Sequence, residues 1–481
     1  MKKKGEKNSY QEFKKEHPRI SKKIRKTLKI SIKEGSFASI SNGLGATYFA
    51  PFALAMQATT SQIGILSAIA NLVPSVSQLG YCKLIGKYSR KKIIITGVAL
   101  KALLWIPIML TALLYFNNIP SAIWILIALT SIFYTIGGAV HPAWFSLMGS
   151  LVPEKERGKY FSQRNKAAQF FGIITMIASA IFLDYMKKIN SIAGETIAYT
   201  LLGFAILFTL AMIIKLYSII LLKNHYEPKL KITKKDQLSL LKFIKSSKHN
   251  PLGRFALFNA CFWIAIGISS PFFVVYMLKN LNFSYTWYVL VVISSIIFQI
   301  IFLTLMGKIS DRFGNIILTK ISTTCIALTP LAWAISYFIP GDLIVKLYLI
   351  FFAQLINGIG WAGFSLATNN FVYDSMNQAR QGYALAYMNL LLGTGAFIGA
   401  IIGTALIKLN IFSINIIIIV FLISFIARAL VVLIGSPYLT EVKKVKKFTP
   451  YFLVHEFHPL KETITEVHHL NHLGAKIIHY D

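Results

Sequence analysis

Two short patterns in this sequence have residue types and spacing that could do chemistry. The run from Gly358 to Gly363 reads Gly-Ile-Gly-Trp-Ala-Gly, which matches the Gly-x-Gly-x-x-Gly fingerprint of a dinucleotide site. Such a site also needs a preceding strand and an acidic residue about twenty positions further on. Here the run lies inside a long apolar stretch and the next carboxylate is Asp374. We therefore interpret these glycines as small residues that let membrane helices pack closely.

The second pattern is the pair His468 and His472 in a polar, His-rich tail. Their i, i+4 spacing would place two imidazoles on one helical face, as some zinc sites require. We expect a solvated or weakly folded tail, with metal binding as the lesser alternative. The sequence has no HExxH, GxSxG or Walker pattern and no paired carboxylates inside an apolar stretch. It therefore predicts no enzyme, no cofactor and no ATP-driven pumping by this chain alone.

The composition is that of a membrane protein. Of 481 residues, 55% are hydrophobic and 14% are charged, whereas soluble chains are about 45–50% apolar and about 25% charged. The net charge of +32 would suggest nucleic acid for a soluble domain. Here the basic residues fall between apolar stretches, as the positive-inside rule describes, so we expect no nucleic-acid partner. Cys82, Cys261 and Cys325 build neither a disulfide framework nor a CxxC metal site.

The apolar stretches predict the elements that must position any site. A helix needs about 20 apolar residues to cross a bilayer, and roughly twelve stretches qualify. They lie near 36–57, 61–82, 93–116, 121–148, 165–187, 197–222, 252–278, 284–307, 316–339, 344–372, 381–408 and 412–436. We predict an all-α integral membrane protein of about twelve transmembrane helices in two six-helix bundles. Its parts are a basic arm (1–34), the first bundle (35–222), a basic linker (223–250), the second bundle (251–437) and a basic, then His-rich tail (438–481).

The charges of the loops predict the orientation. Segments on the N-terminal side of the membrane carry about 33 Lys and Arg, and the opposite loops carry about five. We therefore expect a multi-pass protein of the cell membrane with both termini in the cytoplasm. Its basic cytoplasmic segments would lie at anionic lipid headgroups.

The two predicted bundles resemble each other. The segment from Ala143 to Leu147, at the end of the fourth stretch, recurs as Ala362 to Leu366 at the end of the tenth, and basic and tyrosine residues follow both copies: Arg157, Tyr160, Arg380 and Tyr383. Two similar halves are typical of a large class of transporters.

A loop signature connects the chain to a known family. The run from Gly307 to Asn315 reads Gly-Lys-Ile-Ser-Asp-Arg-Phe-Gly-Asn. It resembles the loop between the second and third helices of a half in the major facilitator superfamily, and the chain looks like a prokaryotic permease of that family with no assigned substrate. The first-half counterpart keeps its basic end but has Cys82, Gly86 and Ser89 where Gly, Asp and Gly are usual. The resemblance covers about residues 35–437.

The resemblance implies a conformational latch. In the family this loop holds the start of a helix in the other half and stabilises one state of the transport cycle. The residues that match are Gly307, Asp311, Arg312 and Gly314, with Arg90 at the basic end of the first-half loop. The latch would be one-sided because Gly86 has no carboxylate. The alternative is an ordinary turn in which Asp and Gly serve local geometry.

The resemblance also implies which helices line a central cavity. Polar and aromatic side chains on those helices are our candidates for the substrate cavity: Asn42, Tyr48, His141, Trp144, Asn259, Trp263, Gln354, Asn357 and Trp361. For each of these residues taken singly, the alternative role is hydrogen bonding between helices.

Four cations lie in stretches that are peripheral in the family: Lys101, Lys215, Lys320 and Arg428. We expect their long side chains to snorkel to the interface.

His141 is the only titratable side chain that this reasoning leaves within the lining helices. We expect no carboxylate there for proton coupling and no central cation to hold an anion. The prediction is a secondary active or facilitative transporter of a small, neutral or amphipathic solute, acting as a monomer by alternating access, with His141 as the possible coupling group. The alternatives are a lipid or lysolipid translocator on the same fold, and a non-transporting sensor or scaffold that works through its His-rich tail.

Overall fold

The computed structural model describes residues 18–84, 88–152, 157–195, 197–228, 250–376, 378–409, 415–443 and 445–446. These residues are almost entirely helical, and the chain divides into two compact units, Met1–Thr233 (unit 1) and Lys234–Asp481 (unit 2). Eleven segments of the described chain are long and apolar enough to cross a membrane, and they coincide with eleven of the twelve predicted stretches.

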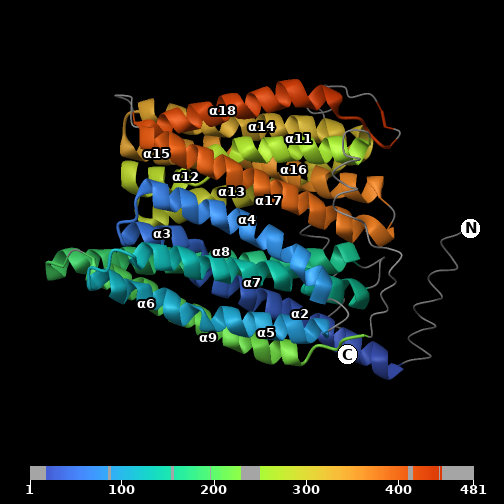
Figure 1. Ribbon diagram of the computed structural model, residues 1–481, viewed down its shortest axis with the longest axis horizontal. Coiled ribbons are helices and arrows are strands. Elements are labelled where there is room, and N and C mark those ends of the chain that lie inside the picture. The colour runs from blue at the N-terminus through green and yellow to red at the C-terminus, as the bar shows by residue number, and fades with distance from the viewer. Residues whose placement is uncertain are drawn as a thin grey trace, which may run out of the picture. The chain divides into compact units, whose positions relative to one another are not determined.

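Unit 1 contains eight α-helices in its described part (Figure 1). They are α2 (Pro18–Leu44), α3 (Phe49–Ala55), α4 (Thr60–Leu84), α5 (Arg90–Leu103), α6 (Trp105–Phe116), α7 (Ala122–Leu151), α8 (Arg157–Ala193) and α9 (Ala198–Lys223), and the short turn η1 (Ala46–Tyr48) joins α2 to α3. The first predicted stretch, 36–57, is therefore broken. The break is at Gly45, where a Cβ atom would collide with the Trp105 ring, so glycine lets that ring approach the backbone.

Unit 2 contains eight α-helices in its described part, with several short turns between them. The helices are α11 (Pro251–Ser269), α12 (Phe272–Val275), α13 (Tyr285–Phe313), α14 (Asn315–Ile335), α15 (Asp342–Tyr348), α16 (Gln354–Ser375), α17 (Gln378–Leu409) and α18 (Ile416–Gly435), of which α12 is a single turn; the turns are η4 (Tyr276–Asn280), η5 (Ser336–Phe338), η6 (Leu349–Ala353) and η7 (Ser436–Tyr438). The break after α11 coincides with Pro271, which cannot donate the next helical hydrogen bond.

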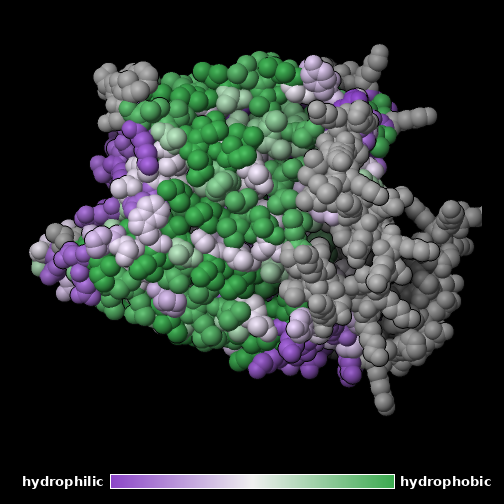
Figure 2. Space-filling view, viewed as in Figure 1, coloured by the Kyte–Doolittle hydropathy of each residue, from purple (hydrophilic) through white to green (hydrophobic). Residues whose placement is uncertain are grey.

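The same order of helix packing recurs inside both units. In unit 1, α2 packs against α8 and α9, α4 against α7, and α5 against α7 and α9. In unit 2, α11 packs against α17 and α18, α13 against α16, and α14 against α16 and α18. Apolar residues cover most of the visible described surface, and hydrophilic residues gather near the ends of helices (Figure 2). This distribution suits helices whose sides face hydrocarbon.

The Gly-x-Gly-x-x-Gly run lies in α16 and serves helix packing. A Cβ atom on Gly358 would lie 2.5 Å from Phe298 of α13, and one on Gly360 would lie 2.6 Å from Ile326 of α14. A Cβ atom on Gly363 would collide with a side chain of α14 as well. The three glycines therefore let α16 approach both neighbours, as expected for small residues between membrane helices.

Candidate functional site

A buried carboxylate, Glu34, lies at the centre of a polar cluster in unit 1. The Glu34 side chain is 7% exposed and pairs with the Arg164 guanidinium of α8 at 3.3 Å. Ser218 of α9 donates its hydroxyl to the other carboxylate oxygen at 3.1 Å. Lys215, also on α9, is buried and is attracted electrostatically by Glu34. The Arg164 guanidinium carbon also lies 4.1 Å from the centre of the Trp144 ring. The cluster thus joins four helices around one ion pair.

Sequence reasoning missed this cluster. Glu34 and Arg164 lie one or two residues outside the predicted stretches 36–57 and 165–187, so neither was counted among the titratable groups of the lining helices. In the structure both helices extend past those bounds, because α2 begins at Pro18 and α8 at Arg157. The structure therefore adds to α2 a buried carboxylate, Glu34, that the predicted bounds of the first stretch left out.

A second carboxylate caps the N-terminus of α5 from the segment after α9. Glu227 accepts hydrogen bonds from the backbone N–H groups of Arg90 at 2.8 Å and Lys91 at 3.4 Å, and from the Ser89 hydroxyl. The Arg90 side chain, only 3% exposed, pairs with Glu227 at 3.4 Å and donates to the Ser146 carbonyl of α7 at 3.0 Å. Because the first N–H groups of a helix have no partner within it, the carboxylate stabilises the start of α5.

The segment that carries Glu227, residues 224–228, is called the strap here, and the pKa values of two of its side chains, His225 and Glu227, are shifted. Partial burial alone would raise the pKa of Glu227, but hydrogen bonds from Ser89, Arg90 and Lys91 outweigh it and hold that pKa below its usual value. His225 is 3% exposed, and neither ring nitrogen has a hydrogen-bond partner in the described structure. Burial lowers the pKa of His225, while Glu34 opposes that shift and Lys91 reinforces it.

We expect acidification to loosen the strap. Both pKa values are lowered in the folded state, so each group contributes stability above its usual pKa that is lost as the pH falls through the folded value. For His225 the loss begins below its usual value of 6.5, and for Glu227 below 4.5. Hydrogen exchange of the Arg90 amide, corrected for the intrinsic rate, should therefore accelerate between pH 7 and about pH 5 in the wild type, where the buried histidine charges first. The same pH dependence in His225→Phe would contradict this assignment.

In unit 2 the N-terminus of α14 is capped in the same way. Glu441, which follows α18, accepts the Ile316 backbone N–H at 2.9 Å. Gly314 has φ +90°, and a Cβ atom there would collide with the Glu441 carboxylate, so glycine serves both the turn and the cap. The Asn315 amide donates to Asp374 of α16 at 2.8 Å. Asp374 in turn pairs with Lys443 at 2.8 Å, which ties the segment after α18 to α16.

The predicted latch residues lie at this end of α13. Asp311 is exposed on the last turn of the helix, and its carboxylate has no hydrogen-bond partner among the residues that the structure describes. The Arg312 carbonyl accepts the backbone N–H of Lys446 at 3.2 Å. Gly307 is half-buried in α13, and Gly86 lies outside the described residues. Within unit 2 the helix cap is therefore Glu441, and the role of Asp311 as a latch stays a prediction.

An aromatic–amide cluster lies in unit 2. The Trp263 ring of α11 and the Trp361 ring of α16 are 5.5 Å apart. The Asn357 amide donates to Ser295 at 2.8 Å and to the buried Gln354 at 3.0 Å. Asn259 is fully buried and donates to the carbonyl one turn earlier, at 2.8 Å. Five of the nine predicted cavity residues, with their partner Ser295, thus belong to α11, α13 and α16 of one unit.

Two buried polar atoms of this cluster are unpaired. The Asn259 side-chain oxygen and the Trp263 indole N–H have no hydrogen-bond partner in the described part of the protein. The two residues are four apart on α11, so they share one helical face. An unpaired buried polar group destabilises the folded protein by about 1–3 kcal/mol. A ligand that hydrogen-bonds to both atoms would remove this cost, so this face of α11 is a candidate binding surface.

The remaining predicted cavity residues belong to unit 1. Tyr48 is fully buried and donates its hydroxyl to the Met176 carbonyl at 2.7 Å, so it is part of the core of that unit. Asn42 is exposed. His141 is exposed and stacks on Phe145, with ring centres 6.5 Å apart. Trp144 contacts Arg164, as described above, and its indole N–H has no partner in the described chain.

The prediction that the intramembrane cations snorkel is wrong for Lys215 and Arg428. Both side chains are buried, at 9% and 2% exposure. Lys215 is attracted electrostatically by Glu34, and Arg428 donates to the Ile326 carbonyl at 2.8 Å and to Ser269 at 2.7 Å. For Arg428 these oxygen partners offset the cost of removing the cation from water, and for Lys215 the negative charge of Glu34 opposes that cost. The other two cations are half-buried, and the Lys101 ammonium lies 4.0 Å from the centre of a phenylalanine ring.

The described residues contain no group of three or more His, Cys, Asp or Glu side chains that could hold a metal ion. The predicted alternative of a metal site at His468 and His472 lies outside the described residues.

Comparison with known proteins places this architecture in a family. No curated protein sequence matches the chain. A similar structure is that of the nucleoside transporter NupG, with a TM-score of 0.63, 14% identity, and coverage of 86% of this chain and 100% of that one. A bacterial homologue of the iron transporter ferroportin in the inward-facing state gives 0.63 at 11% identity, covering 86% and 99%. A D-xylose–proton symporter gives 0.63 at 14% identity, covering 89% and 99%.

The sequence profile described as Major Facilitator Superfamily matches residues 35–345 and, in a second overlapping match, residues 255–467. These matches span most of the chain and agree with its membrane-length helices and its repeated packing order. The chain is a multi-pass membrane protein that belongs to the major facilitator superfamily.

Proposed function

We propose that this protein is a secondary active or facilitative transporter that moves a small neutral or amphipathic solute by alternating access. The observation that carries the proposal is the aromatic–amide cluster of unit 2, where the Trp263 N–H and the Asn259 oxygen are buried and unpaired. A solute with both a hydroxyl or amide donor and an acceptor would satisfy both atoms, while the Trp263 and Trp361 rings would pack on its apolar face.

Two further observations support the proposal. Two of the similar structures are named for uncharged solutes, nucleosides and D-xylose. In the polar cluster of unit 1, Glu34 already pairs with Arg164, so this carboxylate is not free to bind a cationic solute. The loop charges support an orientation with both termini in the cytoplasm.

The proposal is tested by ligand-induced stabilisation followed by uptake. Purified protein is screened against neutral nucleosides, sugars and amides, with organic anions and cations as the contrasting set. We expect a neutral solute to raise the unfolding midpoint and to enter proteoliposomes. Trp361→Ala should weaken its binding about tenfold or more, the factor that corresponds to about 1.4 kcal/mol. Trp124→Ala, an exposed tryptophan of unit 1, is the control. Stabilisation by ions alone, or unchanged binding in Trp361→Ala, would contradict the proposal.

Within this proposal, His141 is the candidate proton-coupling group. It lies in α7, inside a membrane-length segment, and its ring is exposed beside Phe145. A group that gains and loses charge there can tie protonation to a conformational change. We expect the transport rate of the wild type to depend on pH and His141→Gln to flatten that dependence. Identical pH profiles would remove His141 from coupling and leave uniport or a cation held by neutral oxygens.

A further inference from the structure

Two lysines of unit 1 lie deep within membrane-length helices. Lys101 comes 11 residues after Arg90, where α5 begins, and Lys215 comes 8 residues before Lys223, where α9 ends. At 1.5 Å per residue these separations are about 16 Å and about 12 Å. The two helix ends lie together, because Glu227, which follows α9, caps the start of α5. Both lysines are therefore at a similar depth in the same unit.

The Lys101 side chain points into the unit, and there is room beside its ammonium group. One turn earlier on α5, a Cβ atom on Gly97 would collide with Val140, so this face of the helix packs against α7. The Lys101 ammonium lies 4.0 Å from the centre of the Phe133 ring, which is 3% exposed. A Cβ atom on Gly137 of α7 would lie 3.1 Å from the Lys101 Nζ atom, and no other described residue of a neighbouring helix would lie within 4 Å of it. Glycine at this position thus leaves space next to the cation.

The charges around the two lysines do not balance. Lys215 repels Lys101, and Glu34 attracts Lys215. Glu34, however, already pairs with Arg164 at 3.3 Å. Neither lysine ammonium has a hydrogen bond or an ion pair within the part of the chain that the structure describes. With both amines protonated, these four side chains hold three positive charges and one negative charge, which leaves an excess of positive charge inside the unit.

Such an excess favours an anion. A charge in the interior of a membrane protein is costly unless it is paired. Each ammonium group has three N–H donors and no acceptor, so only an acceptor can satisfy it. An anion that accepts from both lysines would form charge-assisted hydrogen bonds and would cancel part of the excess. The space that a missing glycine side chain leaves suits an anion of a single atom.

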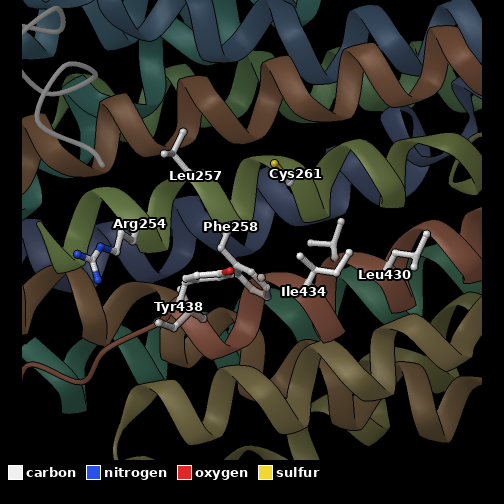
Figure 3. A pocket seen from close by; sticks show the side chains of 10 residues that line it. Arg254, Leu257, Phe258, Cys261, Leu430, Ile434 and Tyr438 are labelled. Carbon is white, nitrogen blue, oxygen red and sulfur yellow. The ribbon is translucent and has the colours of Figure 1, made fainter. Parts of the chain in front are cut away.

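The open pocket on the outside of unit 2 differs from this site in its charge. It lies between α11 and α18, and most of its lining is apolar (Figure 3). Arg254, the charged residue of that lining, already has an interaction within the protein. We therefore assign a ligand to the lysine pair of unit 1 and none to this pocket.

We propose that Lys101 and Lys215 bind a halide-sized inorganic anion, such as chloride, in the interior of unit 1 between α5, α7 and α9. The bound anion neutralises positive charge that the protein leaves unpaired, and it links α5 to α9. The site uses no residue of the aromatic–amide cluster, so it does not depend on the transport proposal.

Chloride-dependent stability tests the site. The unfolding midpoint of the purified protein is measured at pH 6, which favours protonated amines, in sodium chloride and in sodium gluconate of equal ionic strength. We expect chloride to raise the midpoint by about 2–4 °C once its concentration is about five times its dissociation constant, and the effect to saturate. Gluconate is too large for the site and should have no such effect. Equal midpoints in the two salts would overturn the proposal.

Variants show whether the anion binds at the lysine pair. Lys101→Met and Lys215→Met should each abolish the difference between chloride and gluconate, whatever each does to the midpoint itself. The control is Lys320→Met, which removes a half-buried lysine from a membrane-length helix of unit 2 and should keep the difference. A difference that persists in both Lys101→Met and Lys215→Met would place the anion elsewhere and would contradict the proposal.

A measurement on the wild type needs no variant to fold. In crystals soaked in sodium bromide, we expect an anomalous scattering peak between the Nζ atoms of Lys101 and Lys215. The absence of that peak would also overturn the proposal, and it is the result expected if Lys101 releases its proton instead of binding an anion. Neither measurement involves an organic solute, so the transport proposal stands or fails separately.

Discussion

Gly399→Ala is expected to lower the unfolding midpoint markedly, whereas Gly149→Ala should leave it unchanged or raise it. A Cβ atom on Gly399 of α17 would collide with the Ile264 carbonyl of α11 and lie 2.9 Å from the Gly267 Cα atom. Both neighbours are backbone, so a side-chain rotation cannot relieve the clash. Overpacking of this kind costs about 1–3 kcal/mol, and more where the backbone cannot move. A Cβ atom on Gly149 of α7 would meet nothing within 4 Å, and alanine gains about 0.5–1 kcal/mol over glycine in a helix.

The two glycine variants form a matched pair, because each adds one methyl group to a membrane-length helix. Thermal unfolding followed by tryptophan fluorescence in one detergent measures both. Gly395 and Gly403 contact α11 in the same way, at Ala260 and Ile268, so Gly403→Ala should behave like Gly399→Ala. Equal midpoints for Gly399→Ala and Gly149→Ala would show that the α11–α17 contact tolerates separation and that our account of the glycine face is wrong.

Arg428→Met is expected to destabilise unit 2, and Pro330→Ala should recover much of the loss. Pro330 lies inside α14 and has no N–H, so the Ile326 carbonyl four residues earlier lacks its helical partner. Arg428 of α18 donates to that carbonyl at 2.8 Å and replaces the missing bond. Without Arg428 the carbonyl is buried and unpaired, at a cost of about 1–3 kcal/mol. Alanine at 330 restores an N–H for it.

A double-mutant cycle measures this coupling directly. The single change Arg428→Met also removes a buried cation, which by itself is favourable and offsets part of the loss. The interaction energy between the two positions therefore measures the coupling better than either single variant does. We expect a coupling of about 1–3 kcal/mol between the two positions, with the double variant more stable than the sum of the single effects. The control combines Arg428→Met with Thr324→Ala. Thr324 is exposed on α14, two residues before Ile326, so the effects of these two changes on the free energy of unfolding should be additive. Additivity of Arg428→Met and Pro330→Ala would contradict the role given to Arg428.

The fold class and the positions of eleven membrane-length helices could be predicted from the amino-acid sequence. The reason is that a chain in lipid must satisfy every backbone hydrogen bond within a helix, so length and apolar composition suffice to locate the spans. The same argument failed at the first stretch, because the break at Gly45 is imposed by the Trp105 ring from another helix. The predicted stretches also begin later along the chain than α2 and α8 do, so Glu34 and Arg164 were left out of the predicted helices.

Which polar side chains meet could not be predicted, because their contacts depend on how the helices pack. Glu227 caps α5 and Glu441 caps α14 across 137 and 125 residues of sequence, and no local pattern predicts a pair at that separation. The burial of Lys215 and Arg428 could not be predicted from the sequence either, because the sequence of a nearly uniformly apolar helix does not show which of its faces packs against a neighbouring helix. The physical reason is that apolar composition measures the transfer of a helix into the membrane, whereas the position of each polar group depends on the partner that a second helix brings to it.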